Sequence, residues 1–324
     1  MQIDNENEYE DLLGQWSDLE SGLSTLLNHP EATEEFGQRL AQYDRWIQSL
    51  LEQDYDMGLY LLFQLASNSP VGYSASHALV CGVLCHLVAT ELKIIPTERD
   101  SLVRAALTMN IGMTALQDEL ANQVEKPTPK QQAAIRAHPI KSAMILASKG
   151  IYEDDWLDIV TLHHDESVER TDLPVVSTSI RLSRILKAVD RYAAMISPRA
   201  SRAARSAAVS ARTIMTQSNT KADEVASALL KTVGLYPPGT YVRLDSGELA
   251  VVVRRSGVAD KPYVAILGQS SEELYPDPVL HCTSEAKPLI RNALPASSGQ
   301  NQPHHFKILK LSAKIPEMMV PKSG

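Results

Sequence analysis

The chain of 324 residues has only three cysteines and no lysine or arginine before Arg39. Three cysteines cannot form the disulfide framework of a small secreted domain and are typical of a reducing compartment. No run of residues approaches 18 consecutive apolar positions, and the N-terminus lacks the basic and apolar parts of a signal peptide. We therefore expect a cytoplasmic protein with no membrane span. The net charge of -8 argues against general nucleic-acid binding.

Residues 1–53 have no phospho-acceptor pattern or nucleotide-binding loop and instead show two amphipathic repeats separated by His29-Pro30. Such stripes need a surface to bury their apolar face. We expect a helical hairpin that forms a homodimer or docks a protein partner, and the alternative is a monomer whose hairpin packs on its own core. The apolar positions are Tyr9, Leu12, Trp16, Leu19, Leu23 and Leu26, then Phe36, Leu40, Tyr43, Ile47 and Leu50.

The rest of the chain divides by composition. Periodic apolar faces predict a helical domain over residues 54–234. Residues 235–295 alternate between apolar and polar, with a turn at Asp245-Ser-Gly247, which predicts a small β segment that begins with a hairpin. Residues 296–324 resemble a flexible tail. The predicted fold class is mainly α, a helical bundle with an N-terminal hairpin and a small C-terminal β segment.

Scattered histidines are the most informative feature of the helical region. His77 lies in an apolar helical stretch, His138 precedes a proline, His163 and His164 are adjacent, and Asp190 follows in another helical stretch. Neutral imidazoles and a carboxylate are the ligands of a divalent metal site. The spacing predicts a site assembled from several helices. The stretch Ala105–Met113, where a further ligand would be expected, contains neither histidine nor carboxylate.

These ordered motifs resemble the HD-GYP domain, the bacterial cyclic di-GMP phosphodiesterase branch of the HD phosphohydrolase superfamily. The resemblance covers roughly residues 54–234 and implies an HD-like helical bundle and a role in signalling. The matching segments are Tyr73-Ser-Ala-Ser-His77, His138-Pro-Ile-Lys-Ser-Ala-Met-Ile-Leu146, His163-His164-Asp165-Glu166, and Arg184-Ile-Leu-Lys-Ala-Val-Asp190-Arg-Tyr192 followed by Arg199 and Arg202. A Tyr-Pro-x-Gly-Thr-x-Val segment at Tyr236 extends the resemblance into the β segment.

Four functional elements of the family pattern are absent. The namesake His-Asp pair is Met109-Asn110, the lysine that follows it is Met113, and no Gly-Tyr-Pro loop follows Glu166. In the family, the Asp bridges two metals and the His binds one of them. An amide oxygen and a thioether are poor replacements for hard or borderline dications.

The resemblance therefore implies two unequal metal pockets. His138, His163 and His164 would remain as three ligands, with Asn110 as a fourth, and three imidazoles can hold Zn, Fe or Mn. His77 and Asp190 would leave the other pocket with two. We expect one divalent transition metal, or none. The resemblance also implies that Arg199 and Arg202 contact the phosphates of a cyclic dinucleotide.

Each candidate ligand also has a purely structural interpretation. His77 could be a hydrogen-bonded core histidine, and Asp190 could form an ion pair with Arg184 or Arg191. Cys81 and Cys85 share a helical face with His77, where buried cysteine usually serves as a small apolar residue. A His-Cys-Cys metal site is the alternative at that face.

Two functions follow from these residues. The missing ligands favour a degenerate, non-hydrolytic HD-GYP-like protein that acts by binding a ligand or a protein, because a two-metal hydrolase needs both ions. The alternative is a metal-dependent phosphodiesterase with residual activity on cyclic di-GMP or a related nucleotide. Such an enzyme would need a replacement ligand, and Asp165 or Glu166 is the nearest.

Overall fold

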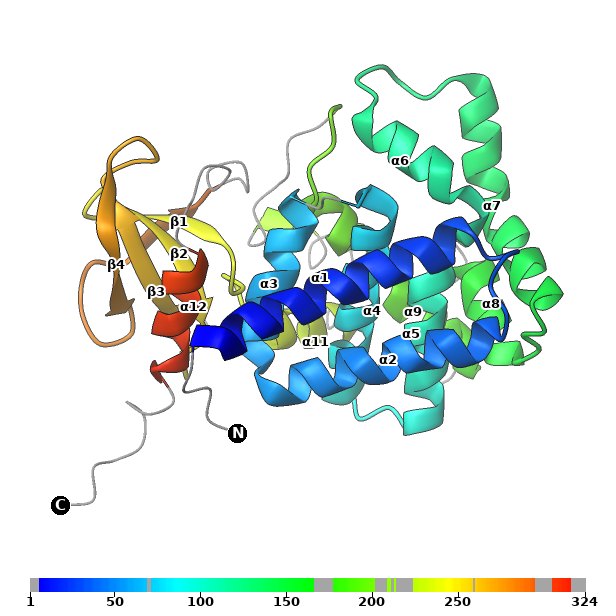
Figure 1. Cartoon of the computed structure of the whole chain (residues 1–324), viewed down its shortest axis with the longest axis horizontal. Coiled ribbons are helices and arrows are strands. Elements are labelled where there is room, and N and C mark those ends of the chain that lie inside the picture. The colour runs from blue at the N-terminus through cyan, green and yellow to red at the C-terminus, as the bar shows by residue number, and fades with distance from the viewer. Residues whose placement is uncertain are drawn as a thin grey trace.

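The computed structural model describes residues 6–68, 71–165, 177–201, 209–210, 213, 224–258, 260–294 and 305–315. It consists of a large helical body with a small antiparallel sheet at one end (Figure 1). This confirms the predicted mainly α class with a C-terminal β segment. The helices are α1 Glu6–Asn28, α2 Phe36–Gln53, α3 Tyr55–Asn68, α4 Tyr73–Glu91, α5 Pro96–Thr108, the 3-10 helix η1 Ile111–Met113, α6 Thr114–Asn122, α7 Pro129–Ser148, α8 Asp154–Leu162, α9 Thr178–Ile196, α11 Glu224–Val233 and α12 His305–Ala313.

The N-terminal hairpin packs on the helical body of its own chain. α1 runs along α4 and contacts α2, while α2 contacts α5 (Figure 1). The described residues of the apolar stripe are buried, with Trp16, Leu23 and Ile47 at 0% exposure, except Tyr43, which is partly buried. The chain's own core therefore supplies the surface that these stripes need. Self-association or partner docking through residues 1–53 stays a prediction, and it would have to use the outer, polar faces of the two helices.

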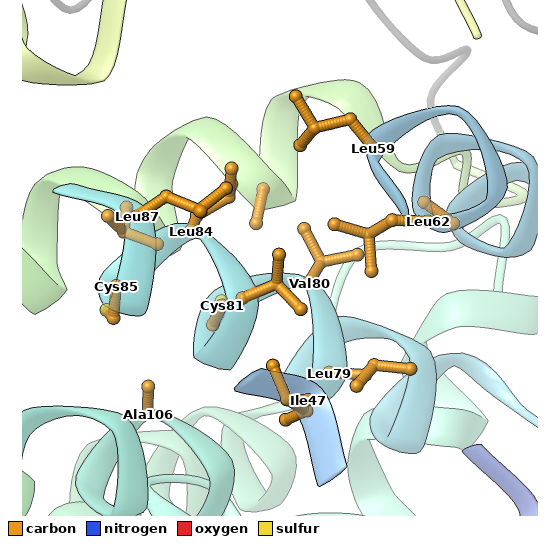
Figure 2. Packing of buried hydrophobic residues seen from close by; sticks show 14 of the residues in the cluster. Ile47, Leu59, Leu62, Leu79, Val80, Cys81, Leu84, Cys85, Leu87 and Ala106 are labelled. Carbon is orange, nitrogen blue, oxygen red and sulfur yellow. The ribbon is translucent and has the colours of Figure 1, made fainter. Parts of the chain in front are cut away.

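α4 is the central helix of the body. Its neighbours include α1, α3, α5, α6, α9 and α11. Apolar side chains of α2, α3 and α5 lie beside those of α4 in the core, among them Ile47, Leu59, Leu62 and Ala106 (Figure 2). By length and composition α4 could cross a membrane, but 83% of the apolar stretch is buried inside the structure. Its all-round apolar surface is that of a buried core helix.

The C-terminal sheet has five antiparallel strands in the order β4-β3-β2-β1-β5. The predicted hairpin is β1 and β2, and Gly247 takes a positive φ of 98° in the turn between them, where a side chain would be strained. The third predicted strand is β3, whereas β4 and β5 were not predicted. The strands are β1 Tyr241–Leu244, β2 Leu249–Arg254, β3 Tyr263–Gly268, β4 Leu274–Cys282 and β5 Ile290–Ala293.

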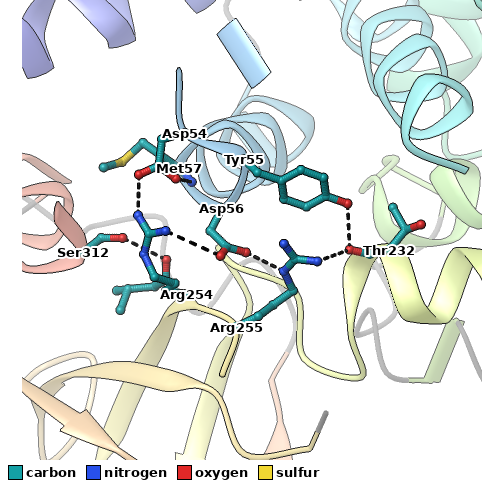
Figure 3. A network of polar contacts seen from close by, with 9 residues as sticks. Asp54, Tyr55, Asp56, Met57, Thr232, Arg254, Arg255 and Ser312 are labelled. Carbon is teal, nitrogen blue, oxygen red and sulfur yellow. Dashed lines mark hydrogen bonds and ion pairs between the residues drawn. The ribbon is translucent and has the colours of Figure 1, made fainter. Parts of the chain in front are cut away.

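A network of ion pairs joins the sheet to the helical body (Figure 3). Arg254, at the end of β2, pairs with Asp54 just before α3. Arg255 pairs with Asp56 at 2.6 Å and donates to the carbonyl of Thr232 in α11 at 2.9 Å. The helical region and the β segment, separate in composition, are thus held together by charge-assisted hydrogen bonds.

Part of the segment predicted to be a flexible tail is an ordered helix. α12 packs against α1, β2 and β4, and Ile308 and Leu309 are buried in the main core. Tyr60 and His305 share a hydrogen bond of 3.1 Å. The prediction of a flexible tail rested on the polar residues 296–304. The residues after them include an apolar set that the fold buries or half-buries, namely Phe306, Ile308, Leu309 and Ile315. The tail prediction is wrong for residues 305–315.

Candidate metal centre

Four helices bring the predicted ligands together. His77 lies on α4, His138 on α7, and Asp190 on α9. His163 and His164 follow the last turn of α8, and α8 packs on both α7 and α9. The ligands form two groups of three, and within each group the ligand atoms lie within 4.8 Å of one another. One group is His138, His163 and His164, and the other is His77, Cys81 and Asp190.

The proline after His138 explains how that histidine is held. Pro139 lies inside α7 and has no N–H, so it cannot donate to the carbonyl of Ile135, four residues earlier. The Nδ1 of His138 lies 2.5 Å from that carbonyl oxygen and donates to it. The freed backbone acceptor thus fixes the proton on Nδ1 and leaves the Nε2 lone pair free.

His163 is held in the same way at a helix end. It follows α8, where the last carbonyls have no partner within the helix. The Nδ1 of His163 lies 2.6 Å from the carbonyl oxygen of Val160. A backbone carbonyl that accepts from one ring nitrogen is the usual outer support of a metal-binding histidine, because it orients the other nitrogen toward the ion.

The two free Nε2 atoms of His138 and His163 face each other at 3.2 Å. Burial lowers the pKa of His138 to about 4 and that of His163 to about 3, so both rings are neutral near pH 7. With both protons on Nδ1, two lone pairs point at one another, an arrangement that a cation between them would stabilise. Nitrogen ligands about 2.0–2.1 Å from a tetrahedral Zn²⁺ would lie about 3.3 Å apart. This pair therefore fits a metal.

His164 and Asn110 are the remaining predicted ligands of this pocket. The ring of His164 lies 4.1 Å from that of His163 and 5.1 Å from that of His138, centroid to centroid, and it is exposed. The Oδ1 of Asn110 is buried and has no hydrogen-bond partner among the described residues. Gly112, two residues later, packs so closely on the His138 turn of α7 that a Cβ would lie 3.1 Å from the His138 carbonyl oxygen. An unsatisfied amide oxygen on this segment suits a weak fourth ligand.

His77 pairs with Asp190, its predicted partner at the second pocket. The Nε2 of His77 lies 2.8 Å from Oδ1 of Asp190, and the Sγ of Cys81 lies 3.6 Å from the same nitrogen. Burial alone would raise the pKa of Asp190, but the hydrogen bond and the charge of His77 outweigh it and hold the pKa well below its usual range. Cys85 is not part of this group.

The support around His77 differs from that around the three histidines. The Nδ1 of His77 is buried and has no hydrogen-bond partner among the described residues. Its ring instead stacks on Tyr73 at 5.4 Å, and the guanidinium of Arg199 lies 4.6 Å above the Tyr73 ring. Asp118 caps the start of α4 through the backbone N–H and hydroxyl of Ser74. Sequence reasoning missed the Tyr73 stack and the Asp118 cap, and only the family motif pointed to Tyr73.

The chain is 31% identical over 192 residues to the cyclic di-GMP phosphodiesterase PA4108 of Pseudomonas aeruginosa, an alignment that covers 57% of this chain and 45% of that protein. Bd1817, an HDG"Y"P protein from Bdellovibrio bacteriovorus, matches in structure with a TM-score of 0.50 and 14% identity, over 68% of this chain and 69% of its own. The helical region is therefore similar to the HD-GYP domain in sequence and in fold. No protein-family model matches the chain.

The chain spans less than half the length of its Pseudomonas relative. Within the helical region, two departures from the HD-GYP pattern, Met109 and Met113, lie within three residues of Asn110 in the sequence. Met109 is buried at 1% exposure, where the family has a metal-binding histidine. Met113 lines a mostly apolar groove of about 460 Å³ between the α1–α2 connection and α7, where the family has a lysine. Arg202 and Glu166 lie outside the described residues.

Proposed function

We propose that this chain is a non-hydrolytic HD-GYP-like protein in bacterial cyclic di-GMP signalling, which acts by binding a ligand or a protein. One divalent transition metal, Zn, Fe or Mn, is held by His138, His163 and His164, with Asn110 as a weak fourth ligand. The family relationship supports the signalling context. Three free cysteines suit a cytoplasmic setting.

The facing Nε2 atoms of His138 and His163 carry this proposal. Both rings are neutral and both are oriented by backbone carbonyls, so the group is preorganised for a cation before any ion arrives. The same pocket lacks a carboxylate at position 110, because asparagine has only a neutral oxygen to place between two ions. One metal without a bridging partner can bind and organise the site, but it cannot clamp both the attacking and the leaving oxygen of a phosphodiester.

The phosphate side of the site supports binding more than turnover. Met113 removes the cation that the family pattern places after the His-Asp pair. Arg199 remains, and it donates to the hydroxyl of Tyr73 at 2.5 Å beside His77. We propose that Arg199, together with Arg202, contacts the phosphates of a cyclic dinucleotide.

The second candidate function is a phosphodiesterase with residual activity on cyclic di-GMP or a related nucleotide. The 31% identity to a cyclic di-GMP phosphodiesterase favours it. Asp165 lies directly after the tandem histidines and is exposed, so its carboxylate could serve as a replacement ligand.

Metal analysis of the purified full chain tests the proposal. After dialysis we expect at most one tightly held transition metal per chain, lost in His164→Ala and kept in His29→Ala, which removes an exposed histidine far from the group in sequence. Two equivalents that survive dialysis and depend on both His77 and His164 would contradict it.

Restoring the family residues provides a second test of the proposed function. In the triple variant Met109→His, Asn110→Asp and Met113→Lys we expect a second tightly held metal, because the bridging carboxylate and the lost imidazole return. Turnover of cyclic di-GMP should lag behind metal binding, since the Gly-Tyr-Pro loop is still absent. Full turnover in the triple variant would show that the loop is dispensable and that the three substitutions alone silence the site.

A further inference from the structure

We propose that Cys81, together with His77 and Asp190, forms a second and distinct metal site that selects a thiophilic ion such as Zn²⁺. The sequence motifs count only two ligands in this pocket. The structure adds the thiol of Cys81, a residue that the family pattern of this chain does not include. The proposed function counts one tightly held metal, and this second site is compatible with it because it binds its ion more weakly and releases it on dialysis.

The geometry of the three side chains fits one ion. His77 and Cys81 lie four residues apart on α4, so their side chains project from successive turns of one face. A tetrahedral Zn²⁺ with bonds of about 2.3 Å to sulfur and about 2.0 Å to nitrogen would hold these atoms about 3.5 Å apart. The observed separation of Sγ and Nε2 is 3.6 Å. The distance of 2.8 Å between Nε2 and Asp190 has to open by about half an ångström, because a metal replaces the shared proton.

The surroundings leave a route into this pocket. His77 is 2% exposed and Cys81 0%, whereas the side chain of Asp190 is 19% exposed. An ion would therefore enter past the carboxylate, which holds its negative charge at neutral pH because the His77 hydrogen bond stabilises it. A carboxylate at the mouth and a thiol at the base give three protein ligands and leave a fourth position for solvent or a ligand atom.

The ligand types decide which metal fits. Thiolate prefers Zn²⁺ or softer ions over Mg²⁺ and Mn²⁺. Binding requires the Cys81 proton to leave, and the proton on Nε2 of His77 to move to Nδ1, so each ion releases one proton from the thiol. Because Nδ1 has no partner among the described residues, this site should bind more weakly than the three-histidine group.

Cobalt substitution tests the proposal through a signal that only a metal-bound thiolate gives. The metal-free, reduced full chain is titrated with Co²⁺, and the near-ultraviolet thiolate-to-cobalt charge-transfer band is recorded. We expect the band in the native chain and its loss in Cys81→Ser. The other two cysteines serve as controls. Cys85 lies one turn further along α4 than Cys81 and is equally buried (Figure 2). Cys282 is on β4. Both Cys85→Ser and Cys282→Ser should retain the band.

A second variant tests whether the two metal sites are independent, and a third controls for misfolding. His164→Ala, an exposed position, should retain the charge-transfer band while the chain loses one equivalent of Zn²⁺. If Cys81→Ser unfolds, as judged by circular dichroism, Cys81→Ala replaces it and should also lack the band. The proposal is overturned if the native chain shows no band with Co²⁺, if the band survives loss of Cys81, or if it disappears in Cys85→Ser.

Discussion

The two candidate ligand groups are built on neighbouring helices but differ in the hydrogen bonds that would orient them toward a metal. His138 and His163 each donate Nδ1–H to a backbone carbonyl, one freed by Pro139 and the other by the end of α8. His77 has no such acceptor among the described residues and is held by ring stacking on Tyr73. The first group is preorganised with neutral lone pairs, whereas the second must rearrange protons to bind. Retained ligand residues alone therefore do not make two pockets equivalent.

Loss of a histidine ligand should produce the largest difference in Zn²⁺ affinity between the two groups. His164→Ala leaves two imidazoles in the first pocket. Loss of a group that only hydrogen-bonds a metal ligand lowers affinity by about 10- to 100-fold, and loss of the ligand itself should lower the affinity for Zn²⁺ by more than that. Competition with a chelator measures the affinity. His29→Ala, at an exposed position in the α1–α2 connection, should leave it unchanged. An unchanged affinity in His164→Ala would mean that this residue is no ligand.

Pro139→Ala tests the hydrogen bond that orients His138 and leaves the metal ligands themselves unchanged. The new backbone N–H competes with His138 for the carbonyl of Ile135, so metal affinity should fall by about 10- to 100-fold. Thermal unfolding of the metal-free chain should show a gain of roughly 1–3 kcal/mol, because the helix regains a hydrogen bond and loses a ring clash.

Pro129 is the matched control, because it lies at the first turn of α7, where no carbonyl needs its N–H. Pro129→Ala should leave metal affinity at the native value. Equal losses in the two proline variants would show that helix stability, and not the orientation of His138, governs binding.

Metal affinity should depend on pH in only one of the two pockets. The pKa values of about 4 for His138 and about 3 for His163 mean that these rings have already lost their second proton at pH 7, so affinity there should stay flat from pH 7 to 8. Burial raises the pKa of Cys81 well above its usual value, so the thiol is still protonated over that range. Affinity at the Cys81 pocket should therefore rise about tenfold per pH unit. Zn²⁺ titrations of His164→Ala and Cys81→Ser at several pH values give the two slopes separately.

Arg199→Ala should produce the smallest difference in Zn²⁺ affinity between the two pockets. The guanidinium over Tyr73 contributes about 0.5–1 kcal/mol of cation–π energy, so its loss should weaken Zn²⁺ binding at the His77 pocket by about two- to fivefold. The three-histidine pocket should not respond. Arg243→Ala, in the distant sheet, is the control. Equal weakening of both pockets would indicate that Arg199 acts through the overall charge.

Sequence patterns predicted the helical framework because the apolar periodicity reports which face of each helix is buried. The stripe around Trp16 and Ile47 is buried as its spacing implied, and the turn at Gly247 joins the expected strands. The ordered motifs predicted that His77 and Asp190 meet across two helices. The carbonyl partners of His138 and His163 could not be predicted, because they depend on where helical hydrogen bonds are missing. Cys81 was interpreted as a small core residue, since its distance from Asp190 exists only in the folded chain. α12 was missed because a short apolar period followed a long polar segment.

The central claim is that this chain holds a metal without catalysing hydrolysis, and one assay tests it most directly. The full chain, with one equivalent of metal confirmed at the three-histidine group, is incubated with cyclic di-GMP and the products are separated by chromatography. The account predicts intact cyclic di-GMP at the level of the protein-free control, in the native chain and in His164→Ala alike. Sustained product formation by the native chain that His164→Ala abolishes would contradict it and establish the phosphodiesterase alternative.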